Sequence, residues 1–501
     1  MMVAQVIAPE WSFAELVSGI CDLADPPAAL VSGLSLDSRR VEKGHLFFAC
    51  AGGQVHGKRF IDDAIDHGAD VVMWEASETQ RELRRGVPVI GVPGLREIIG
   101  PIAERFYGSP TEEQFVVGVT GTNGKTSISQ FVAQAFQVEG PCAVIGTLGN
   151  GLFGKLRAGT HTTPDAISLH ALLDEMRIAE VSRVVMEVSS HGLEQGRTAG
   201  VAFDVAVFSN LSHEHLDYHG DMESYARAKQ RLFQLEGLKA AVINADDEFG
   251  QKLLRELPAG VKAISYGFGR GIEKPDLLGS DLQLDLKGLR MRVQSAWGDG
   301  ELCAPVLGAF NAENLLAALG VLLASDINFE QALLRLSQVK PVPGRMENYG
   351  GGKQPLVVVD YAHTPNALEQ VLLALREHTQ GKLWCVFGCG GDRDKSKRPL
   401  MVAKAASLAE QIIVTDDNPR SEGSAQIISD IMQGCENVSH VKVVADRASA
   451  IVEAIHKAAL GDIVLVAGKG HEDYQLIGDQ RLPFSDAVEV KKALLGWKGD
   501  C

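Results

Sequence analysis

The sequence has no excess of basic residues, no long apolar run and no closely spaced set of cysteines. Its 48 Lys and Arg against 64 Asp and Glu give a formal net charge of -16. That charge argues against a nucleic-acid-binding role, because phosphate backbones attract basic surfaces. The longest apolar stretch, around residues 315–324, is shorter than a bilayer span, so we expect no membrane association. No Lys or Arg precedes Arg39, which predicts that a secretory signal is absent.

The eight cysteines are scattered along the chain. Only Cys385 and Cys389 lie close together, and no second close pair completes a zinc site. We therefore expect structural thiols in a reducing compartment, and a cytoplasmic protein. A length of 501 residues exceeds what one hydrophobic core supports, so several domains are expected.

The strongest functional signal is QFVVGVTGTNGKTS, at residues 114–127. Its apolar run 115–119 indicates a buried strand, and apolar residues recur at helical spacing after residue 127. Between them, Gly-x-x-Gly-Lys-Thr is a short form of phosphate-binding loop (P-loop), with Val119 where the longer form has glycine. Backbone N–H groups would cradle the phosphates, Lys125 would reach the β/γ oxygens and Thr126 would reach Mg²⁺. We therefore expect the chain to bind a nucleoside triphosphate.

Acidic and histidine side chains follow two further predicted strands. The strand 183–186 runs into Glu187, at the strand end where an α/β NTPase needs a carboxylate. The strand 203–208 is followed by three histidines and two acids between His213 and His219, which could form a metal and phosphate edge. A zinc site is the alternative, but the spacing matches no zinc framework.

The last part of the chain alternates regularly between strands and helices. Predicted strands at 356–359, 383–387, 411–414, 441–444 and 463–466 alternate with helices that begin near Asn366, Pro399, Ala425 and Ala448. This pattern indicates a doubly wound parallel sheet. Polar clusters follow four of the strands, at 360–363, 388–394, 415–420 and 468–472. Ligands bind beyond the carboxyl ends of such strands, so these clusters predict a ligand site.

Proline and glycine at residues 340–344 mark a linker before this region. Near the start of the chain, short strands at 45–50, 71–74 and 89–92 alternate with helical stretches at 60–67 and 95–106. We therefore predict an α/β protein with three domains. They are a small N-terminal α/β domain at 1–110, a central P-loop ATPase-type α/β domain at 111–342, and a C-terminal Rossmann-like doubly wound domain at 343–501.

In these motifs the chain resembles the Mur ligase family. The match includes GTNGKT at 121–126, TTPD at 162–165, MEVSSHGL at 186–193, VPGRME at 342–347, VDYAHTP at 359–365, CGGDRD at 389–394, DNPR at 417–420 and AGKGHE at 467–472. It implies ATP-dependent amide formation, with ATP and Mg²⁺, between UDP-N-acetylmuramoyl-L-alanyl-D-glutamate and a diamino acid. The glutamyl carboxylate would become an acyl phosphate, which the amine would attack. We expect a monomer that acts on these small molecules.

The resemblance implies roles for individual residues in the first two domains. ATP would contact Gly121, Thr122, Asn123, Gly124, Lys125, Thr126 and Ser127, and also Asn311, Arg345 and Asp360 of later motifs. Mg²⁺ would be held by Thr126, Glu187, His215 and Lys229, and the catalytic set would be Lys125, Glu187, His215 and Lys229. The UDP-sugar and its dipeptide would contact Leu36, Ser38, Gly53, Gln54 and Val55 of a UDP-binding N-terminal domain, and Thr162, Thr163, Ser189, Gln195 and Arg197. By itself Lys229 would be a solvated helical lysine; only the resemblance implies that it is carbamylated to N6-carboxylysine.

The choice of amino acid is expected to depend on Asp-Asn-Pro-Arg at residues 417–420. In the family this motif occurs in ligases that add meso-diaminopimelate, and ligases that add lysine have another residue in place of the arginine. L-lysine is therefore the alternative substrate. The chemistry agrees, because an arginine can hold a second carboxylate by a bidentate pair. The implied contacts are Arg393, Asp417, Asn418, Pro419, Arg420, Gly468 and Glu472, with Glu472 on the distal ammonium. Two positions depart from the family pattern: His161 replaces an Asn, and His213 lies beside the expected metal ligand His215.

Three other functions were weighed. A nucleotide-dependent switch protein should carry a guanine-reading Asn-Lys-x-Asp, which the sequence lacks. Folylpolyglutamate synthase shares the ligase architecture but should lack both the Asp-Asn-Pro-Arg motif and the N-terminal domain. The switch protein would also leave the four C-terminal polar clusters unexplained. A small-molecule kinase would release no phosphate stoichiometrically with amide. The ligase interpretation uses every cluster.

Overall fold

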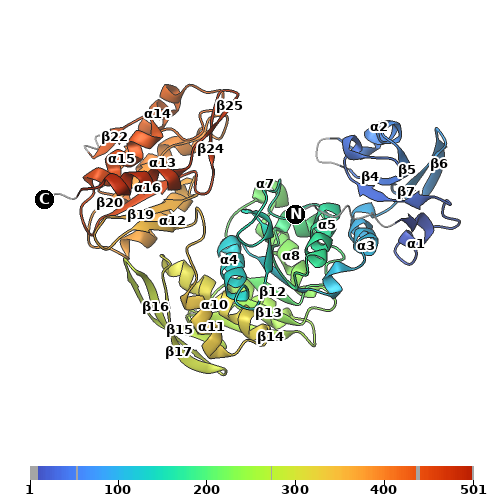
Figure 1. The fold of residues 1–501 in the computed structure, drawn as a ribbon, viewed down its shortest axis with the longest axis horizontal. Coiled ribbons are helices and arrows are strands. Elements are labelled where there is room, and N and C mark those ends of the chain that lie inside the picture. Colours follow the sequence, from blue (N-terminus) through green and yellow to red (C-terminus); the bar gives the residue numbers. More distant parts are fainter. Residues whose placement is uncertain (1–9, 52–54, 272–273, 436–439, 499–501) are drawn as a thin grey trace. The chain divides into compact units, whose positions relative to one another are not determined.

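The computed structural model describes residues 10–51, 55–271, 274–435 and 440–498, and it is an α/β structure as predicted (Figure 1). The chain divides into two compact units, Met1–Ile264 and Ser265–Cys501, and each is described here by itself. Within the described residues, no helix is both long and apolar enough to cross a bilayer.

The first unit begins with a small five-stranded sheet. Its strand order is β3 (Gly33–Ser35), β4 (His45–Ala49), β5 (Ala69–Glu75), β7 (Val87–Val92) and β6 (Gln80–Arg84). All neighbours are parallel except β6, which is antiparallel to β7. The accompanying elements are β1 (Trp11–Ser12), β2 (Leu30–Val31), α1 (Phe13–Val17), η1 (Ser38–Arg40), η2 (Gly57–Phe60), α2 (Ile61–Asp66) and α3 (Leu95–Phe106). Alternate residues of β4 and β5 face α1 and α3 in one core, and the others face α2 in a second.

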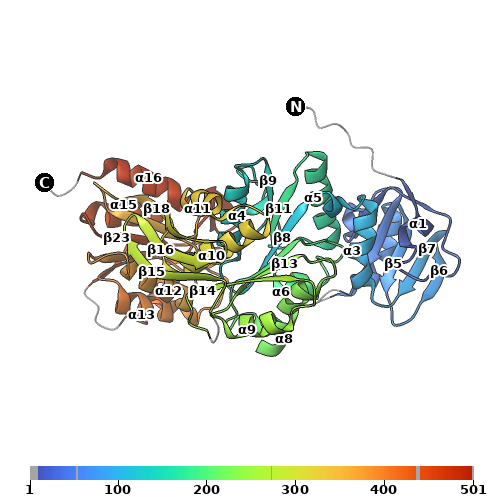
Figure 2. The same cartoon turned by 90° about the horizontal axis from the view of Figure 1, so that it is seen from below.

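A larger sheet in the first unit places the P-loop at its centre. In sheet order the strands are β10 (Gly149–Leu152), β9 (Cys142–Gly146), β11 (Arg183–Glu187), β8 (Phe115–Thr120), β12 (Val205–Phe208), β13 (Ala240–Asn244) and β14 (Lys262–Gly267). Its helices include α4 (Lys125–Phe136), α5 (Ala166–Ile178), α6 (Ser190–Glu194), α7 (Leu216–His219), α8 (Met222–Gln230) and α9 (Glu248–Glu256). Because β8 is parallel to both β11 and β12, the carboxyl ends of these three strands meet at one edge. Figure 2 shows β8 and β13 between α4 and the pair α8 and α9.

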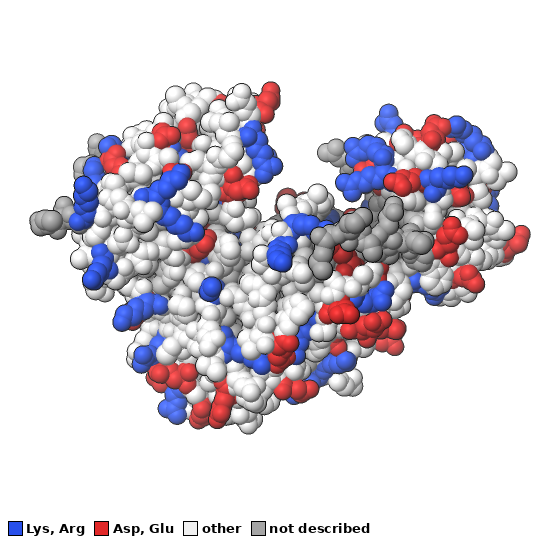
Figure 3. Space-filling model, in the orientation of Figure 1, with Lys and Arg blue, Asp and Glu red and all other residues white. Residues whose placement is uncertain are grey.

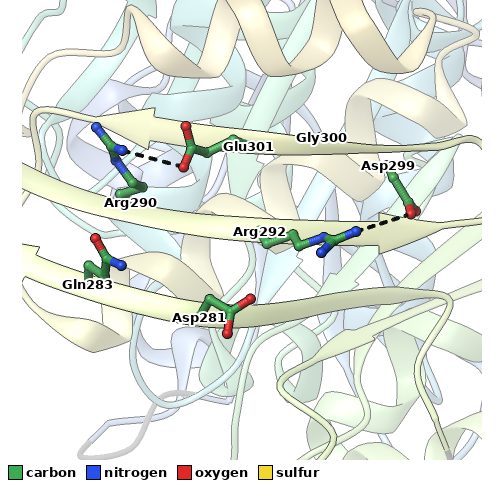
Figure 4. Close-up of a pocket in the computed structure, with 7 residues that line it drawn as sticks. All are labelled: Asp281, Gln283, Arg290, Arg292, Asp299, Gly300 and Glu301. Carbon is green, nitrogen blue, oxygen red and sulfur yellow. Dashed lines mark ion pairs between the residues drawn. The ribbon is translucent and has the colours of Figure 1, made fainter.

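The second unit begins with three antiparallel strands, β15 (Leu277–Asp285), β16 (Gly288–Ser295) and β17 (Gly298–Ala304), followed by α10 (Ala309–Ala324) and α11 (Phe329–Ser337). The outer face of these strands has a shallow pocket lined by charged side chains (Figure 4). There Arg290 pairs with Glu301 at 3.6 Å and Arg292 with Asp299 at 3.9 Å. Such exposed pairs stabilise little, and none of the pocket residues belongs to the predicted sites. Nothing in the sequence analysis anticipated these three strands.

The rest of the second unit is a six-stranded sheet whose alternation agrees with the prediction. Its order is β18 (Glu347–Gly350), β19 (Leu356–Asp360), β23 (Ile463–Ala467), β20 (Leu383–Phe387), β21 (Gln411–Val414) and β22 (Val441–Val443), parallel except for β18. Helices α12 (Pro365–Arg376), α13 (Lys397–Leu408) and α14 (Ser424–Met432) cover one face, and α15 (Arg447–Lys457) and α16 (Asp486–Gly496) cover the other. This is a doubly wound sheet, and a hairpin of β24 (Tyr474–Ile477) and β25 (Gln480–Pro483) follows β23.

Lys and Arg side chains are interspersed with Asp and Glu on the face drawn in Figure 3. Within each unit, this face carries no continuous basic band of the kind that nucleic-acid backbones bind.

Candidate functional site

The P-loop connects β8 directly to α4. Gly121 has a φ of 143° and Gly124 a φ of 88°, and a side chain at either position would be strained. A Cβ at Gly121 would also lie 1.9 Å from the Ser209 hydroxyl, so the loop passes too close to the end of β12 for any other residue. α4 then begins at Lys125. The first backbone N–H groups of a helix that starts there point toward the interior of the loop.

Neighbouring residues hold this loop in shape. The Lys125 ammonium donates to the carbonyls of Gly121 and Thr122, at 2.9 and 2.8 Å. The carbonyl of Asn210, which follows β12, accepts from the Thr122 N–H at 2.8 Å, and its side-chain oxygen accepts from the Asn123 N–H at 3.0 Å. Asn210 is not among the site residues expected from the sequence. Its role in shaping the loop depends on the pairing of β12 with β8.

Glu187 ends β11 and is only 2% exposed. Its carboxylate accepts from the Thr126 hydroxyl at 2.9 Å, and from the backbone N–H and hydroxyl of Thr147 at 2.8 and 3.2 Å. The structure therefore brings Thr126 and Glu187 together, as the sequence predicted, and adds Thr147, which no motif signalled. A hydroxyl and a carboxylate side by side at a helix N-terminus are the oxygen ligands that Mg²⁺ prefers beside phosphates.

Lys229 lies on α8 and is only 1% exposed, so it does not lie on a solvated helix face. Its ammonium group donates to the Gly121 carbonyl at 2.8 Å and lies 4.4 Å from the centre of the Tyr225 ring. Burial, together with the charge of Lys125, holds the Lys229 pKa well below its usual range. A lowered pKa favours the neutral amine, which is the form that can add carbon dioxide.

His191 lies close to two of the histidines that the sequence placed together between His213 and His219. The ring of His191 lies 5.0 Å from that of His215 and 5.3 Å from that of His219. His215 has a φ of 57°, and its side chain is half-exposed. His213 is exposed. The part of the chain that the structure describes contains no group of three or more His, Cys, Asp or Glu side chains arranged as a metal site. Of the four expected Mg²⁺ ligands, Thr126 and Glu187 lie in hydrogen-bond contact with each other.

The residues expected to hold the muramoyl-dipeptide form one hydrogen-bonded group. The hydroxyl of Thr162 lies 3.1 Å from that of Thr147, and the Thr163 hydroxyl donates to the Glu187 carbonyl at 2.9 Å. The Thr163 hydroxyl also lies 3.0 Å from the Ser189 hydroxyl. Arg197 donates from Nη1 to the Thr163 carbonyl at 2.8 Å and from Nη2 to Gln195 Oε1 at 2.7 Å. His161, which precedes this group, is exposed and its Nδ1 lies 3.0 Å from the Thr160 hydroxyl.

The expected uridine contacts are only partly described. Ser38 is buried at the start of η1, where the Asp37 carboxylate accepts from the Arg39 N–H. Leu36 precedes it in the same turn and is partly buried, and Val55 is exposed. Gly53 and Gln54 lie outside the described residues.

In the second unit, polar side chains meet beyond β19, β20, β21 and β23. Arg420, with a φ of 55°, donates from Nη1 to the Gly391 carbonyl at 2.7 Å. Asn418 donates to Glu472 at 3.0 Å, and a Cβ on Gly468 would lie 3.4 Å from the Asp417 carboxylate. A Cβ on Gly391 would overlap the Pro419 carbonyl. The expected diaminopimelate contacts on these loops are thus packed together, except Arg393, which is exposed and donates only to the Asp392 carbonyl at 3.4 Å.

Two buried cations lie beside this cluster, Arg447 and Lys469, and the sequence predicted no individual role for either. Arg447 forms a fully buried ion pair with Asp486 and donates to the carbonyls of Asp416 and Ala467 at 3.2 and 2.9 Å. Lys469 donates to Asn418 and Glu472, both at 3.0 Å. The Asp417 carboxyl lies between these cations, and its burial raises its pKa although both cations act to lower it.

The remaining expected ATP contacts also lie in the second unit. Asp360, at the end of β19, accepts from the N–H groups of Met346 and Ala362, both at 2.8 Å, and burial raises its pKa. The Arg345 guanidinium lies 5.0 Å from the centre of the Tyr361 ring. Asn311, on the first turn of α10, donates to the Leu307 carbonyl at 2.7 Å.

Comparison with known proteins places this arrangement in a family. The model of the Mur ligase middle domain matches residues 119–322, that of the Mur ligase glutamate ligase domain matches 344–470, and that of the Mur ligase family catalytic domain matches 30–107. The chain belongs to the Mur ligase family.

Several similar proteins share one name, UDP-N-acetylmuramoyl-L-alanyl-D-glutamate–2,6-diaminopimelate ligase. The protein of that name from Coxiella burnetii is 49% identical over 469 residues, which cover 93% of this chain and 96% of the relative. Its counterpart from Alkalilimnicola ehrlichii is 47% identical over 482 residues, or 94% of this chain and 96% of the relative. A solved structure of the same name is 39% identical with a TM-score of 0.75, and the match covers 97% of this chain and 99% of that one.

Proposed function

We propose that the chain is an ATP-dependent ligase that joins meso-2,6-diaminopimelate to the D-glutamyl carboxylate of UDP-N-acetylmuramoyl-L-alanyl-D-glutamate. The observation that carries this proposal is the similarity to the Coxiella burnetii 2,6-diaminopimelate ligase, which is 49% identical over 93% of the chain. The P-loop with its adjacent Thr126 and Glu187, and the packed loops around Arg420 and Glu472, supply sites for the two halves of the reaction. Peptidoglycan precursor synthesis is the process that such a ligase serves.

In the proposed reaction, an oxygen of the glutamyl carboxylate attacks the γ-phosphorus of ATP and ADP leaves. The resulting acyl phosphate is attacked at its carbonyl carbon by the neutral amine of the amino acid. Phosphate then leaves with the former carboxylate oxygen, and the new amide nitrogen loses its proton. A free carboxylate is a poor acyl donor, so this activation needs the energy of ATP. The loop N–H groups and Lys125 would stabilise the charge on the phosphoryl group during transfer.

Thr126 and Glu187 fit one Mg²⁺, and we propose His215 and Lys229 as ligands of a second. Bound Mg²⁺ would neutralise charge on the transferring phosphoryl group. The burial of Lys229, which lowers its pKa, supports the proposal that it is carbamylated. The carbamate would add two oxygens and a negative charge for Mg²⁺. The test is ¹³C NMR of the protein in ¹³C-bicarbonate. A carbamate signal is expected in the wild type and not in Lys229→Gln; equal spectra would contradict the modification.

We propose the substrate contacts from the same arrangement. The UDP-sugar dipeptide would be held by the residues predicted for it, of which Thr162, Thr163, Ser189, Gln195 and Arg197 share one hydrogen-bonded group. Arg420 would hold the second carboxylate of diaminopimelate, and Glu472 its distal ammonium. Asn311, Arg345 and Asp360 would contact the nucleotide. The seven cysteines among the described residues form no disulfide, which supports a reducing compartment, and we propose a cytoplasmic monomer.

Alternatives fit less of the chain. Folylpolyglutamate synthase would lack the Asp417–Arg420 motif and an N-terminal domain, whereas this chain has a five-stranded sheet before the P-loop.

The proposed product can be identified by mass spectrometry, because its mass should equal that of UDP-muramoyl-dipeptide plus diaminopimelate less one water. With ¹⁸O in the glutamyl carboxylate, the acyl-phosphate route predicts one ¹⁸O in the released phosphate. Product without label transfer would contradict that route.

A further inference from the structure

Lys469 is a fully buried lysine that none of the expected roles uses. It follows β23, and its side chain is 0% exposed. Its ammonium donates to Asn418 Oδ1 and to Glu472 Oε2, both at 3.0 Å, and lies 3.6 Å from Asp417 Oδ1. A buried ammonium is costly unless charged and polar partners satisfy it, and all three partners here are proposed diaminopimelate contacts.

The first consequence concerns the side-chain amide of Asn418. Its oxygen accepts from Lys469 and also from the backbone N–H of Leu476, at 2.9 Å. With two donors on the oxygen, the amide NH₂ must point to the other side, where it donates to Glu472 at 3.0 Å. Lys469 and the Leu476 N–H together fix the orientation of the amide, and Asn418 presents a donor on the side of Glu472.

The second consequence concerns charge. Asp417 and Glu472 are two carboxylates in one cluster. Burial chiefly, and also the charge of Glu472, raise the Asp417 pKa. Asp417 Oδ1 is buried without a hydrogen-bond partner. An ammonium ligand needs at least one ionised carboxylate, yet two unpaired ones would repel each other. A fixed cation between them offsets one charge and leaves the other for the ligand.

We propose that Lys469 is a positioning residue for the distal end of the diamino acid, acting through Asn418 and Glu472. The inference rests on the proposed function, because it takes diaminopimelate as the ligand of this cluster. Lys469 itself touches no substrate. Its effect is to fix the amide of Asn418 and one carboxylate oxygen of Glu472 before the ligand arrives.

The test compares Lys469→Met, Lys469→Gln and Lys469→Arg in phosphate-release kinetics, with each substrate varied in turn. Met removes the charge and the donors, and Gln keeps a neutral donor. Both should raise the KM for meso-diaminopimelate by about 10- to 100-fold, the effect of losing hydrogen bonds to a charged group. The KM values for ATP and the UDP-dipeptide should stay within about twofold. Arg keeps the cation and should recover part of the loss.

Lys492→Met is the matched control, because Lys492 also pairs with a glutamate three residues away, at 2.8 Å, but is 65% exposed. It should leave every KM unchanged. Unchanged diaminopimelate KM in both Met and Gln variants would overturn the inference. A similar rise in the KM values for diaminopimelate, ATP and the UDP-dipeptide, together with a lower Tm, would also overturn the inference, because it would indicate that Lys469 has a purely structural role. Absence of turnover by the wild-type chain would instead overturn the proposed function, and the inference with it.

Discussion

Glu187 offers a way to separate the charge of the P-loop site from its structure. Its carboxylate accepts from the Thr147 N–H, from the Thr147 hydroxyl and from the Thr126 hydroxyl. In Glu187→Gln the amide oxygen can keep the bond to the Thr147 N–H. The amide NH₂ can donate to the two hydroxyls, because hydroxyls also accept. The variant therefore loses a negative charge but no hydrogen-bonding partner.

We expect Glu187→Gln to leave the Tm nearly unchanged and to lower kcat on the order of 10²- to 10³-fold, as for loss of one electrostatic contact in a preorganised site. Higher Mg²⁺ should restore part of the activity. Glu187→Ala instead removes the acceptor of the part-buried bond from the Thr147 N–H, at a cost of about 1–3 kcal/mol. Its Tm should fall by about 2–12 °C, because 1 kcal/mol shifts the Tm of a domain of this size by roughly 2–4 °C.

The assays are phosphate release across a range of Mg²⁺ and thermal unfolding of the same samples. Glu236→Gln is the control, because Glu236 is exposed in the same unit and should behave as wild type. A Glu187→Gln variant with wild-type kcat at low Mg²⁺ would refute the assignment of Glu187 to the metal. A large Tm loss in that variant would refute the hydrogen-bond argument.

Three further predictions concern other parts of the chain. Arg447→Met leaves Asp486 buried without its partner and should cost about 3–5 kcal/mol, whereas Arg447→Met with Asp486→Leu should recover part of the loss in denaturant unfolding. Burial lowers the His170 pKa from 6.5 to about 4, so the unfolded chain protonates first as the pH falls, and on the order of 3 kcal/mol should be lost between those values. His170→Gln, which can still donate to the Ala199 carbonyl, should flatten that pH dependence; an unaltered slope would contradict it. Arg420→Lys should raise the KM for diaminopimelate about 10- to 100-fold and lower the ratio of kcat/KM for diaminopimelate to kcat/KM for L-lysine. An unchanged ratio of these two kcat/KM values would count against the role of Arg420.

Much of the fold could be predicted because local patterns decide it. The apolar run 383–387 and the helical spacing of 95–106 coincide with β20 and α3. The strands β15 to β17 were missed although a signal was present. In β16, buried Leu289, Met291 and Val293 alternate with exposed Arg290 and Arg292, a period of two that indicates an antiparallel strand with one solvated face.

The site was predictable where a motif carries its own geometry, as for Thr126 and Glu187. It was not predictable where the environment comes from distant parts of the chain. The burial of Lys229 depends on Gly121, which is 108 residues away, and composition around residue 229 gives no sign of it. Lys469 likewise sits in a glycine-rich turn whose sequence does not reveal that Asn418 and Glu472 enclose it.

The most direct test of the central claim is phosphate release with UDP-N-acetylmuramoyl-L-alanyl-D-glutamate, ATP and Mg²⁺, with meso-diaminopimelate or L-lysine added in parallel. The account predicts stoichiometric phosphate and amide with diaminopimelate, and little of either with lysine. Equal turnover with lysine would contradict the role of Arg420 while keeping the ligase. No turnover with either amino acid would contradict the proposed function itself.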